Sequence, residues 1–427
     1  MADTGVVALG GDHVGNFGRP PTVPYRQDST PRAMLDSTVV PTAIQGSLLT
    51  PPLPGDREVE LMRYHGVDLH KKYVTVSVRD QAGAQIAFMG REVDISGYVG
   101  RLNGEDVVAL EASAGALYWA ERIGERGARC VVVDAYRFRI IRDSWQKTDR
   151  HDAVNLSLAL WLAQTTGQVK LPVVWQPGPT VRELRRLTGM YEIINKQIRQ
   201  LKNEVHGVLL DNGVRDQGVG EKLVESPGRT TELLASLALT PASRFCVQGA
   251  LRQLLALGQE KEMLQRRLYW TGRPLDNDVR LLMGIRGITP LMALVFLSEV
   301  GDITRFSSAR KMYAYLGVVP RVRSSGGTTR TGKINRASRY LARSLFTQVV
   351  PHLVGSSPSM GKFYLQLAAR KGFGRARIAV LRKMFGVMRR MLLDGEQYRG
   401  IEGALYARKI RAYERELKKA GVEQEAA

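Results

Sequence analysis

The stretch YHGVDLHKKYVTVSVRDQAGAQIAFM, residues 64–89, decides how the first folded part of the chain is built. Apolar and polar residues alternate in Tyr73–Val78, as they do in a strand with one buried face. The turn-forming segment Gln81–Gly83 separates this strand from the next apolar run. The stretch therefore predicts three consecutive strands joined by tight turns.

Two continuous apolar runs follow this meander. They are VVALEAS at 107–113 and CVVVDA at 130–135, and both are typical of strands buried on two faces. Helices are predicted over about 115–126 and again from Asp149 onward. The order predicts an α/β domain over residues 61–175, in which helices cover a sheet.

The composition limits the class of protein. The chain has 427 residues and a formal net charge of +21, and this positive excess favours a polyanionic partner such as DNA or RNA. Cys130 and Cys246 are its two cysteines, which excludes a disulfide scaffold and a cysteine-based zinc site. No apolar run approaches the roughly 18–20 residues of a membrane span, so a membrane partner is not expected. We expect a cytoplasmic, nucleoid-associated protein.

Residues 1–60 form a tail rich in proline and glycine without sustained periodicity, and they are predicted to be disordered. The start lacks the basic and apolar regions of a secretory signal. One explanation of the tail is a translation start assigned too early, because Met62 lies immediately before the first predicted strand.

Residues 176–275 are predicted to be a helical, coiled-coil region. Apolar residues recur there at alternating spacings of three and four, the seam of a heptad repeat. A second amphipathic helix is predicted over 247–270. The seam fits a helical hairpin within one chain and a dimerising coiled coil equally well. Its residues are Leu184, Leu187, Tyr191, Ile194, Ile198, Leu201, Val205 and Val208.

Residues 276–395 are predicted to form a mostly α-helical, basic domain, and 396–427 a charged C-terminal helix or tail. Gly284 and Gly287 lie between two apolar helices, a helix-hairpin-helix pattern in which backbone N–H groups contact a phosphate. The alternative is a tight interhelical turn. A Ser-Gly-rich loop follows in a stretch without acidic residues, which favours phosphate contact. The cations predicted to bind nucleic acid there are Arg321, Arg323, Arg330, Lys333, Arg336 and Arg339.

Four carboxylates are candidates for one site. Asp68 interrupts an apolar strand and Glu111 ends another, where an uncompensated charge is costly. Asp149 and Asp152 share a face at the start of a helix, although the helix dipole alone would favour an acid there. Converging carboxylates are typical of a site for two hard divalent cations that act on a phosphodiester. Asp134 is a competing carboxylate.

The segments HGVDLHKK (65–72), ALEASAG (109–115) and KTDRHDA (147–153) occur in this order. They resemble the RuvC-like DEDD domain, an RNase H-like fold, of the insertion-sequence transposases that use a bridge RNA. Residues 284–343, with their SSGG sequence, resemble the C-terminal transposase domain of the same family. The resemblance covers roughly residues 62–395.

The resemblance implies a transposase that recombines donor and target DNA under the guidance of a noncoding bridge RNA. It implies that Asp68, Glu111, Asp149 and Asp152 bind Mg²⁺ or Mn²⁺ and that Ser325 is the nucleophile, with Ser324 as the adjacent alternative. It also implies homodimers and homotetramers, in which Ser325 of one subunit meets the acids of another. Without the resemblance, the residues of the serine segment favour a flexible Ser-Gly turn.

The chain departs from the family after the serine segment. The usual Lys-x-Gly-Asn-x-x-Leu-Arg pattern is replaced at residues 335–342 by Asn-Arg-Ala-Ser-Arg-Tyr-Leu-Ala, without the glycine and the first arginine. Two other functions remain open from the residues. One is an RNase H-like, metal-dependent nuclease in which the serine is incidental, and the other is a non-catalytic nucleic-acid-binding protein.

Overall fold

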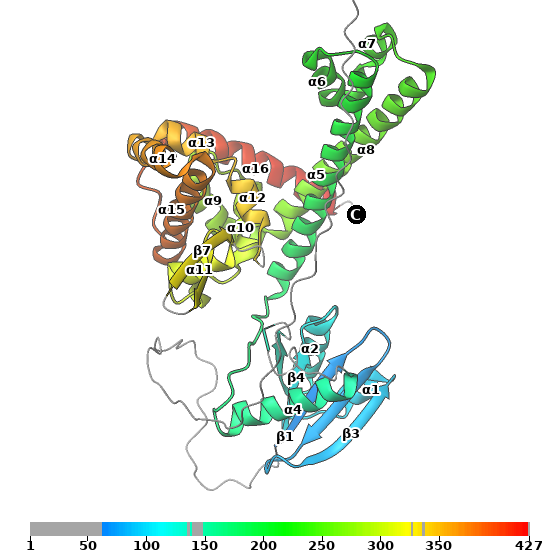
Figure 1. Ribbon diagram of the computed structural model, residues 1–427, viewed down its shortest axis with the longest axis vertical. Helices are drawn as coiled ribbons and strands as arrows, with labels where there is room; N and C mark the ends of the chain where they lie inside the picture. Colours follow the sequence, from blue (N-terminus) through cyan, green and yellow to red (C-terminus); the bar gives the residue numbers. More distant parts are fainter. Residues whose placement is uncertain (1–61, 135–136, 139–147, 326–327, 335–337, 426–427) are drawn as a thin grey trace, which may run out of the picture. The chain divides into compact units, whose positions relative to one another are not determined.

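The computed structural model describes residues 62–134, 137–138, 148–325, 328–334 and 338–425. The predicted N-terminal tail, residues 1–60, lies outside them. Within the described residues an α/β domain is followed by a largely helical remainder that carries one β-hairpin (Figure 1).

The α/β domain contains a five-stranded mixed sheet with the strand order β3-β2-β1-β4-β5. β1 pairs antiparallel with β2 and β2 with β3, whereas β1–β4 and β4–β5 are parallel. This confirms the predicted meander and the two buried strands that follow it, and the order is consistent with an RNase H-like sheet. The strands are β1 Arg63–Leu69, β2 Val74–Arg79, β3 Gln85–Glu92, β4 Asp106–Glu111 and β5 Arg129–Val133.

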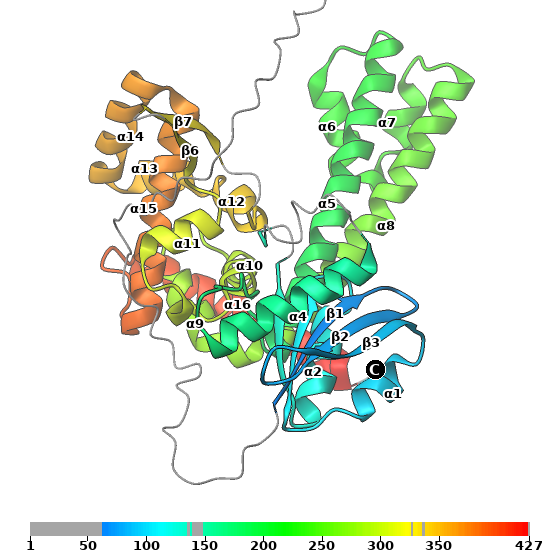
Figure 2. The ribbon, with the colours of Figure 1, turned by 60° about the horizontal axis from the view of Figure 1, so that its bottom comes forward.

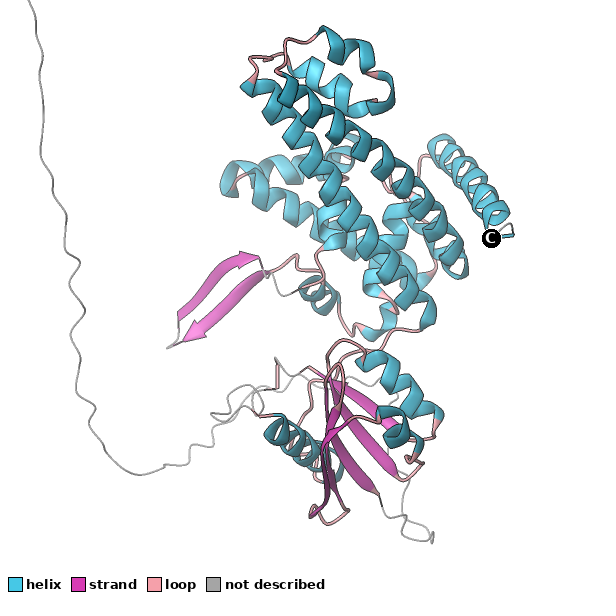
Figure 3. Ribbon diagram, turned by 90° about the vertical axis from the view of Figure 1, so that its right-hand side faces the viewer, coloured by secondary structure: helices cyan, strands magenta, loops and turns pink. Residues whose placement is uncertain are grey.

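Helices cover both faces of this sheet (Figure 3). Val67 and Leu69 of β1 pack with α1 and α2 on one face, and Tyr64 packs with α4 on the other, because successive residues of a strand face opposite sides. The helices are α1 Ile95–Gly100, α2 Ala116–Glu125 and α4 Asp149–Thr165. The sequence pattern predicted α2 and the start of α4 but not α1, a six-residue helix capped by Asp94.

The remainder is organised around a large core in which Phe296, Phe346 and Phe385 contact one another. The helix Pro290–Val300 lies in this core and is buried from Ala293 to its last residue. The helices are α5 Pro179–Asp211, α6 Gln217–Glu225, α7 Thr231–Ser236, α8 Pro241–Thr271, α9 Asp276–Met283, α10 Pro290–Val300, α11 Ala309–Tyr315, α12 Leu341–Phe346, α13 Val350–Ser356, α14 Pro358–Lys371, α15 Phe373–Asp394 and α16 Gly403–Glu425.

The heptad seam packs within the chain, with half of its eight residues buried and the other half partly buried. α5 and α8 run side by side, with α6 and α7 at one end of the pair (Figure 2). Val205 and Leu209 of α5 pack with Leu251 and Leu254 of α8, and Leu184 lies in the large core. The packing follows the first of the two arrangements that the seam allowed, a helical hairpin within one chain.

The serine segment forms a β-hairpin, and the expectation of a loop there is wrong. β6 (Pro320–Ser325) pairs antiparallel with β7 (Thr328–Ile334), in a register that sets Arg323 opposite Arg330. The Gly-Gly pair between two alternating runs is a hairpin signal, which the small residues of the Ser-Gly segment obscure.

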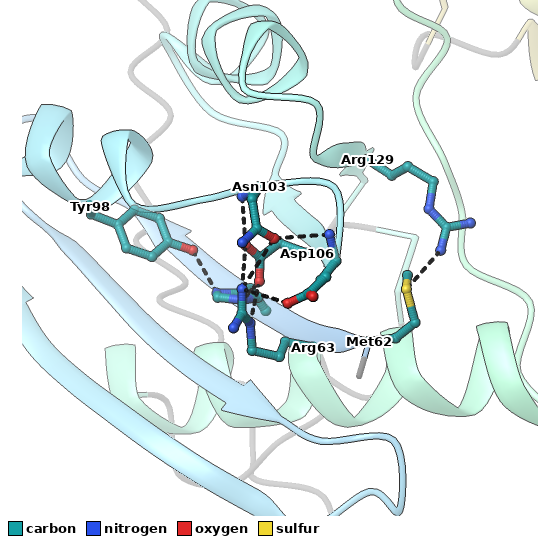
Figure 4. Close-up of polar contacts among 8 residues, drawn as sticks. Met62, Arg63, Tyr98, Asn103, Asp106 and Arg129 are labelled. Atoms are coloured by element: carbon teal, nitrogen blue, oxygen red, sulfur yellow. Dashed lines mark hydrogen bonds and ion pairs between the residues drawn. The ribbon is translucent and has the colours of Figure 1, made fainter. Parts of the chain in front are cut away.

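A buried polar network fixes the edge of the sheet opposite the predicted acids (Figure 4). Asp106, only 1% exposed, accepts hydrogen bonds from the Nε of Arg63 at 2.7 Å and the backbone N–H of Asn103 at 2.8 Å. His65 Nε2 lies 2.9 Å from the same carboxylate, and His65 Nδ1 lies 3.0 Å from the Tyr98 hydroxyl. Burial opposes ionisation of Asp106, but the hydrogen bonds outweigh it and hold its pKa well below the usual range.

We expect Asp106→Ala to lower the free energy of unfolding by about 3 kcal/mol, because it leaves the buried His65 and the half-buried Arg63 without their shared acceptor. Glu105→Ala is the control and should cost less than about 1 kcal/mol, since Glu105 makes only a 3.6 Å, partly exposed ion pair with Arg63. Urea denaturation followed by circular dichroism measures both. Equal midpoints for the two variants would contradict this role of Asp106.

The stabilisation that Asp106 contributes depends on pH. The folded-state pKa of Asp106 is lowered, so the unfolded chain binds more protons at acidic pH. The stabilisation is complete above about pH 5 and is lost as the pH falls toward the lowered pKa. The stability gap between wild type and Asp106→Ala should therefore narrow on acidification below about pH 5.

Candidate active site

Two of the predicted acids lie at the carboxyl ends of neighbouring parallel strands, Asp68 as the second-last residue of β1 and Glu111 as the last residue of β4. In the β1–β4 register, Val67 pairs with Leu110, and the next residues along the two strands are Asp68 and Glu111. Parallel strands end at the same edge of a sheet, so these two positions are adjacent. Asp68 is 7% exposed and Glu111 is half-buried.

The other two acids come from the first turn of α4. Thr148 caps this helix by accepting a hydrogen bond from the N–H of His151, which places Asp149 and Asp152 in the first turn. The helix lies directly on β1, because a Cβ at Gly66 would overlap the carbonyl oxygen of Ala153 and the amide nitrogen of Ser157. Gly66 and Asp68 are two residues apart and share this face of the strand.

Asp68, His70 and Asp149 meet at this edge. His70 Nε2 lies 3.0 Å from Asp68 Oδ2 and 3.3 Å from Asp149 Oδ2. One ligand atom from each of the three residues lies within 4.8 Å of the others. Tyr73, across the β1–β2 turn, donates its hydroxyl to Asp149 Oδ2 at 3.0 Å. The structure thus brings two of the four predicted acids into direct proximity and adds a histidine and a tyrosine.

The electrostatics of the cluster favour a cation. Burial raises the pKa of Asp68, the imidazole of His70 opposes the shift, and the negative charges of Asp149 and Asp152 add to it. The hydrogen bond to Asp149 raises the pKa of the Tyr73 hydroxyl. Carboxylates that repel one another beside an imidazole form a donor set that suits a divalent ion, with phosphate oxygens as further ligands. The residues present therefore fit a metal site.

Asp152 and Glu111 stand farther from this centre. Asp152 is close enough for its charge to act on Asp68, but within the described part of the chain neither it nor Glu111 joins the group confined to 4.8 Å. Both are half-buried at the same edge of the sheet.

Asp134, the competing carboxylate, has a local role. Its carboxylate lies 3.3 Å from the Nε of Arg137 and accepts from the backbone N–H of Arg137, so it caps the turn after β5. His151 likewise bonds to the helix cap, with Nδ1 at 2.7 Å from Thr148 Oγ1.

His70 and Tyr73 were not predicted as site residues. His70 lies two positions after Asp68 and just beyond the strand, where a lone histidine beside a carboxylate is more often an ordinary hydrogen-bonded residue. Tyr73 comes directly before β2, and the tight β1–β2 turn returns it to the end of β1. The tight turn between the two strands is the sequence signal that places Tyr73 near Asp68.

We expect Asp68→Asn to weaken Mn²⁺ binding by more than about 10-fold, because it removes a buried ligand charge from the Asp68–His70–Asp149 cluster. Asp134→Asn is the matched control and should bind Mn²⁺ as the wild type does, since Asp134 is engaged with Arg137. Isothermal titration of the full chain with MnCl₂ measures both affinities. Undiminished binding by Asp68→Asn would show that the metal lies elsewhere.

The α9–α10 turn is packed inside the helical remainder. Gly284 is buried and its N–H donates to the carbonyl oxygen of Leu281. Gly287 adopts a positive φ of 85° and is half-buried against Val349 and His352. This geometry fits the tight interhelical turn, the alternative reading of the two glycines.

Arg339 is engaged internally. Its guanidinium forms two contacts with the buried Glu299, at 3.0 Å from Nε and 2.9 Å from the terminal nitrogen. Burial raises the pKa of Glu299 and the Arg339 charge opposes this shift. The arginine compensates a buried carboxylate, a role different from the predicted phosphate contact.

The predicted cations of the hairpin are exposed where they are described. Arg321 in β6 and Arg330 and Lys333 in β7 are exposed. The side chain of Arg323 and the whole of Arg336 lie outside the described residues. Ser325 ends β6 opposite Thr328, and Ser324 precedes it opposite Thr329.

The helical remainder contains a segment that matches a known protein family. Residues 279–365 match the model of the Transposase IS116/IS110/IS902 family. A probable family 20 transposase of Pseudomonas aeruginosa is 27% identical over 306 residues, 68% of this chain and 80% of the relative. The transposase for insertion sequence element IS1111A of Coxiella burnetii is 24% identical over 355 residues, 80% of this chain and 93% of the relative.

An acidic cluster on a mixed sheet, joined to this segment, defines the class of protein as a transposase, an enzyme of DNA strand transfer. Residues 279–365 are thus similar to the IS116/IS110/IS902 family of transposases, and the similarity to the two relatives extends over 68% and 80% of the chain. In the part of the chain that the structure describes, no helix combines the length and the apolar character needed to cross a bilayer.

Proposed function

We propose that this transposase cleaves and exchanges DNA strands through a serine nucleophile, Ser325, with the acids Asp68, Glu111, Asp149 and Asp152 holding Mg²⁺ or Mn²⁺. The observation that carries the proposal is the convergence of Asp68, His70 and Asp149 at one edge of the sheet. The serine belongs to the segment that matches the transposase family.

The serine step conserves the number of phosphoester bonds. The Oγ of Ser325 attacks the phosphorus of a DNA phosphodiester, a new Ser–O–P bond forms, and the bond to one deoxyribose oxygen breaks. A base accepts the hydroxyl proton of the serine, and the departing deoxyribose oxygen takes up a proton. The covalent phosphoserine keeps the bond energy, so religation to another strand needs no ATP.

The residues around these groups have complementary tasks. Arg321, Arg330 and Lys333 are exposed on the serine hairpin and suit the equatorial phosphate oxygens, whose negative charge grows in the transition state. His70 and Tyr73 hold the carboxylates of the acidic cluster in place. A bound divalent ion would supply Lewis-acid stabilisation of the phosphate charge.

We further propose that a noncoding bridge RNA guides the reaction and that the enzyme works as a homodimer or homotetramer. The net charge of +21 suits a nucleoprotein complex, and the RNA itself rests on the resemblance of the sequence motifs. Assembly is supported by exposed apolar side chains on the α5–α8 pair, namely Met190, Ile193 and Met263, each about half exposed. In such an assembly Ser325 of one subunit would serve the acids of another.

A covalent trapping experiment tests the proposal. The chain, co-expressed with the noncoding flank of its element, is incubated with end-labelled junction DNA and Mg²⁺, denatured and separated on a gel. We expect a labelled band at the mass of the protein, and no band when the flank is omitted from the expression. A band without the flank would contradict RNA guidance.

The same gel distinguishes the other functions. Cleaved DNA with free ends and no protein-linked label would identify a metal-dependent nuclease, in which the acidic cluster acts without the serine. Binding of the junction without cleavage would leave a nucleic-acid-binding protein.

A further inference from the structure

The C-terminal helix α16 has two different faces. One face packs into the protein, where Tyr413 is 1% exposed and contacts Tyr269 of α8 edge-on, with ring centroids 5.7 Å apart. Ala420 is also buried, and Trp270 approaches the position of Gly421. In Figure 1, α16 is the red helix that leads to the C-terminus. The helix is therefore a fixed part of the fold.

The opposite face carries a row of four cations, Arg408, Arg411, Arg415 and Lys418. Their spacing of three, four and three residues places them along one side of the helix. All four are exposed, and together with Glu414 they line a shallow cavity of about 340 Å³. We call these four residues the α16 basic face.

The positive charge of the α16 basic face is not neutralised within the described residues. The acid in its lining, Glu414, is held at 2.9 Å by Arg280 of α9, which also bonds to Asp276 at 2.6 Å. In the residues that the structure describes, none of the four cations forms an ion pair.

The mutual repulsion of these four cations opposes the stability of the isolated helix. Like charges three or four residues apart on a helix repel one another and destabilise the helix. Neighbouring salt bridges such as Lys419–Glu416, at 2.8 Å, show how a cation of the same helix is otherwise paired. A row of unneutralised cations on a rigid helix is what a polyanion would stabilise.

We propose that the α16 basic face binds the phosphate backbone of duplex DNA without reading its sequence. Ten residues of α-helix span about 15 Å, and B-DNA carries one phosphate charge per 1.7 Å of axis, so four cations in a row can each reach a phosphate. Guanidinium groups, three of the four, suit phosphate oxygens. The surface lies outside residues 279–365 and requires neither the serine chemistry nor the RNA.

The test measures how salt affects binding of the full chain to a labelled 30-base-pair duplex of arbitrary sequence, by fluorescence anisotropy in KCl from 50 to 300 mM. The variant Arg408→Gln, Arg411→Gln, Arg415→Gln, Lys418→Gln removes the whole face. The slope of log K against log salt should fall in magnitude by about 3–4, because each phosphate contact contributes about 0.9. The loss of affinity between 50 and 200 mM KCl should shrink by about 100-fold.

The matched control neutralises four other basic residues, each of which already faces a carboxylate, so the net charge changes equally. Its slope should change by less than about 1. The substitutions are Arg122→Gln, Arg137→Gln, Arg266→Gln and Lys419→Gln.

Three outcomes would overturn the proposal. Equal slopes for the α16 variant and the wild type would exclude contact between the α16 basic face and duplex DNA. A loss seen with single-stranded RNA of the same length but not with the duplex would assign the face to RNA. An equally large decrease of the slope in the control variant would show that the effect comes from net charge. Circular dichroism melting confirms that each variant is folded, and the lysine variant Arg408→Lys, Arg411→Lys, Arg415→Lys should keep the wild-type slope.

Discussion

Replacing Ser325 by alanine is expected to abolish the covalent protein–DNA adduct and to reduce strand exchange by a factor on the order of 10³ or more. The variant removes the oxygen that would form the bond to phosphorus. Ser325 ends β6, and the hairpin is held by backbone pairing with β7, so the variant should fold as the wild type does. The measurement is the labelled adduct band on a denaturing gel.

Ser324→Ala is the matched control for this prediction. The two serines occupy successive positions of β6, opposite Thr329 and Thr328, and successive positions of a strand belong to opposite faces. Ser324→Ala should therefore retain the adduct. The reverse result, adduct lost with Ser324→Ala and kept with Ser325→Ala, would move the nucleophile by one residue. An adduct in both single variants would exclude each serine as the sole nucleophile.

Replacing Gly66 by alanine is expected to destabilise the α/β domain by about 3 kcal/mol and to weaken Mn²⁺ binding at the same time. A Cβ at this position would overlap backbone atoms of Ala153 and Ser157, and a backbone cannot move aside as a flexible side chain can. α4 would have to shift away from β1, carrying Asp149 away from Asp68. Thermal melting by circular dichroism and titration with MnCl₂ measure the two effects.

Gly124→Ala provides the comparison. Gly124 lies in α2, where an added Cβ would meet nothing within 4 Å, and alanine is about 1 kcal/mol more favourable than glycine inside a helix. This variant should be at least as stable as the wild type and should bind Mn²⁺ equally well. A Gly66→Ala protein that melts with the wild type would show that α4 can accommodate the methyl group.

The strands of the sheet could be predicted because alternating residues and short, unbroken apolar runs are both typical of strands. Val67, Leu69 and the alternating run after Tyr73 face a core, and the runs ending at Glu111 and Asp134 are apolar without a break. Parallel pairing of β1 with β4 then sets Asp68 beside Glu111, so acids at strand ends could be expected to gather.

The details of the site depend on contacts that no local pattern contains. His70 belongs to the cluster because a tight turn follows it. Asp134 is paired with Arg137 and is not one of the three residues of the cluster. The heptad seam is compatible with a helical hairpin within one chain and with a dimerising coiled coil. The path of the chain through α6 and α7 is what brings α5 against α8 of the same molecule. The small residues of the Ser-Gly segment are typical of a loop, and they obscure the alternation of the two strands that pair there.

The position of Asp68 within β1 has a consequence for how the domain tolerates change. The strand carries His65 toward the Asp106 network, Gly66 toward α4 and Asp68 toward the acidic cluster, all within four consecutive residues. A single-residue deletion or insertion inside β1 would turn each of these side chains to the opposite face of the sheet. Length changes should instead accumulate at the Asp80–Ala84 turn, where β2 and β3 can be joined by more residues without altering β1.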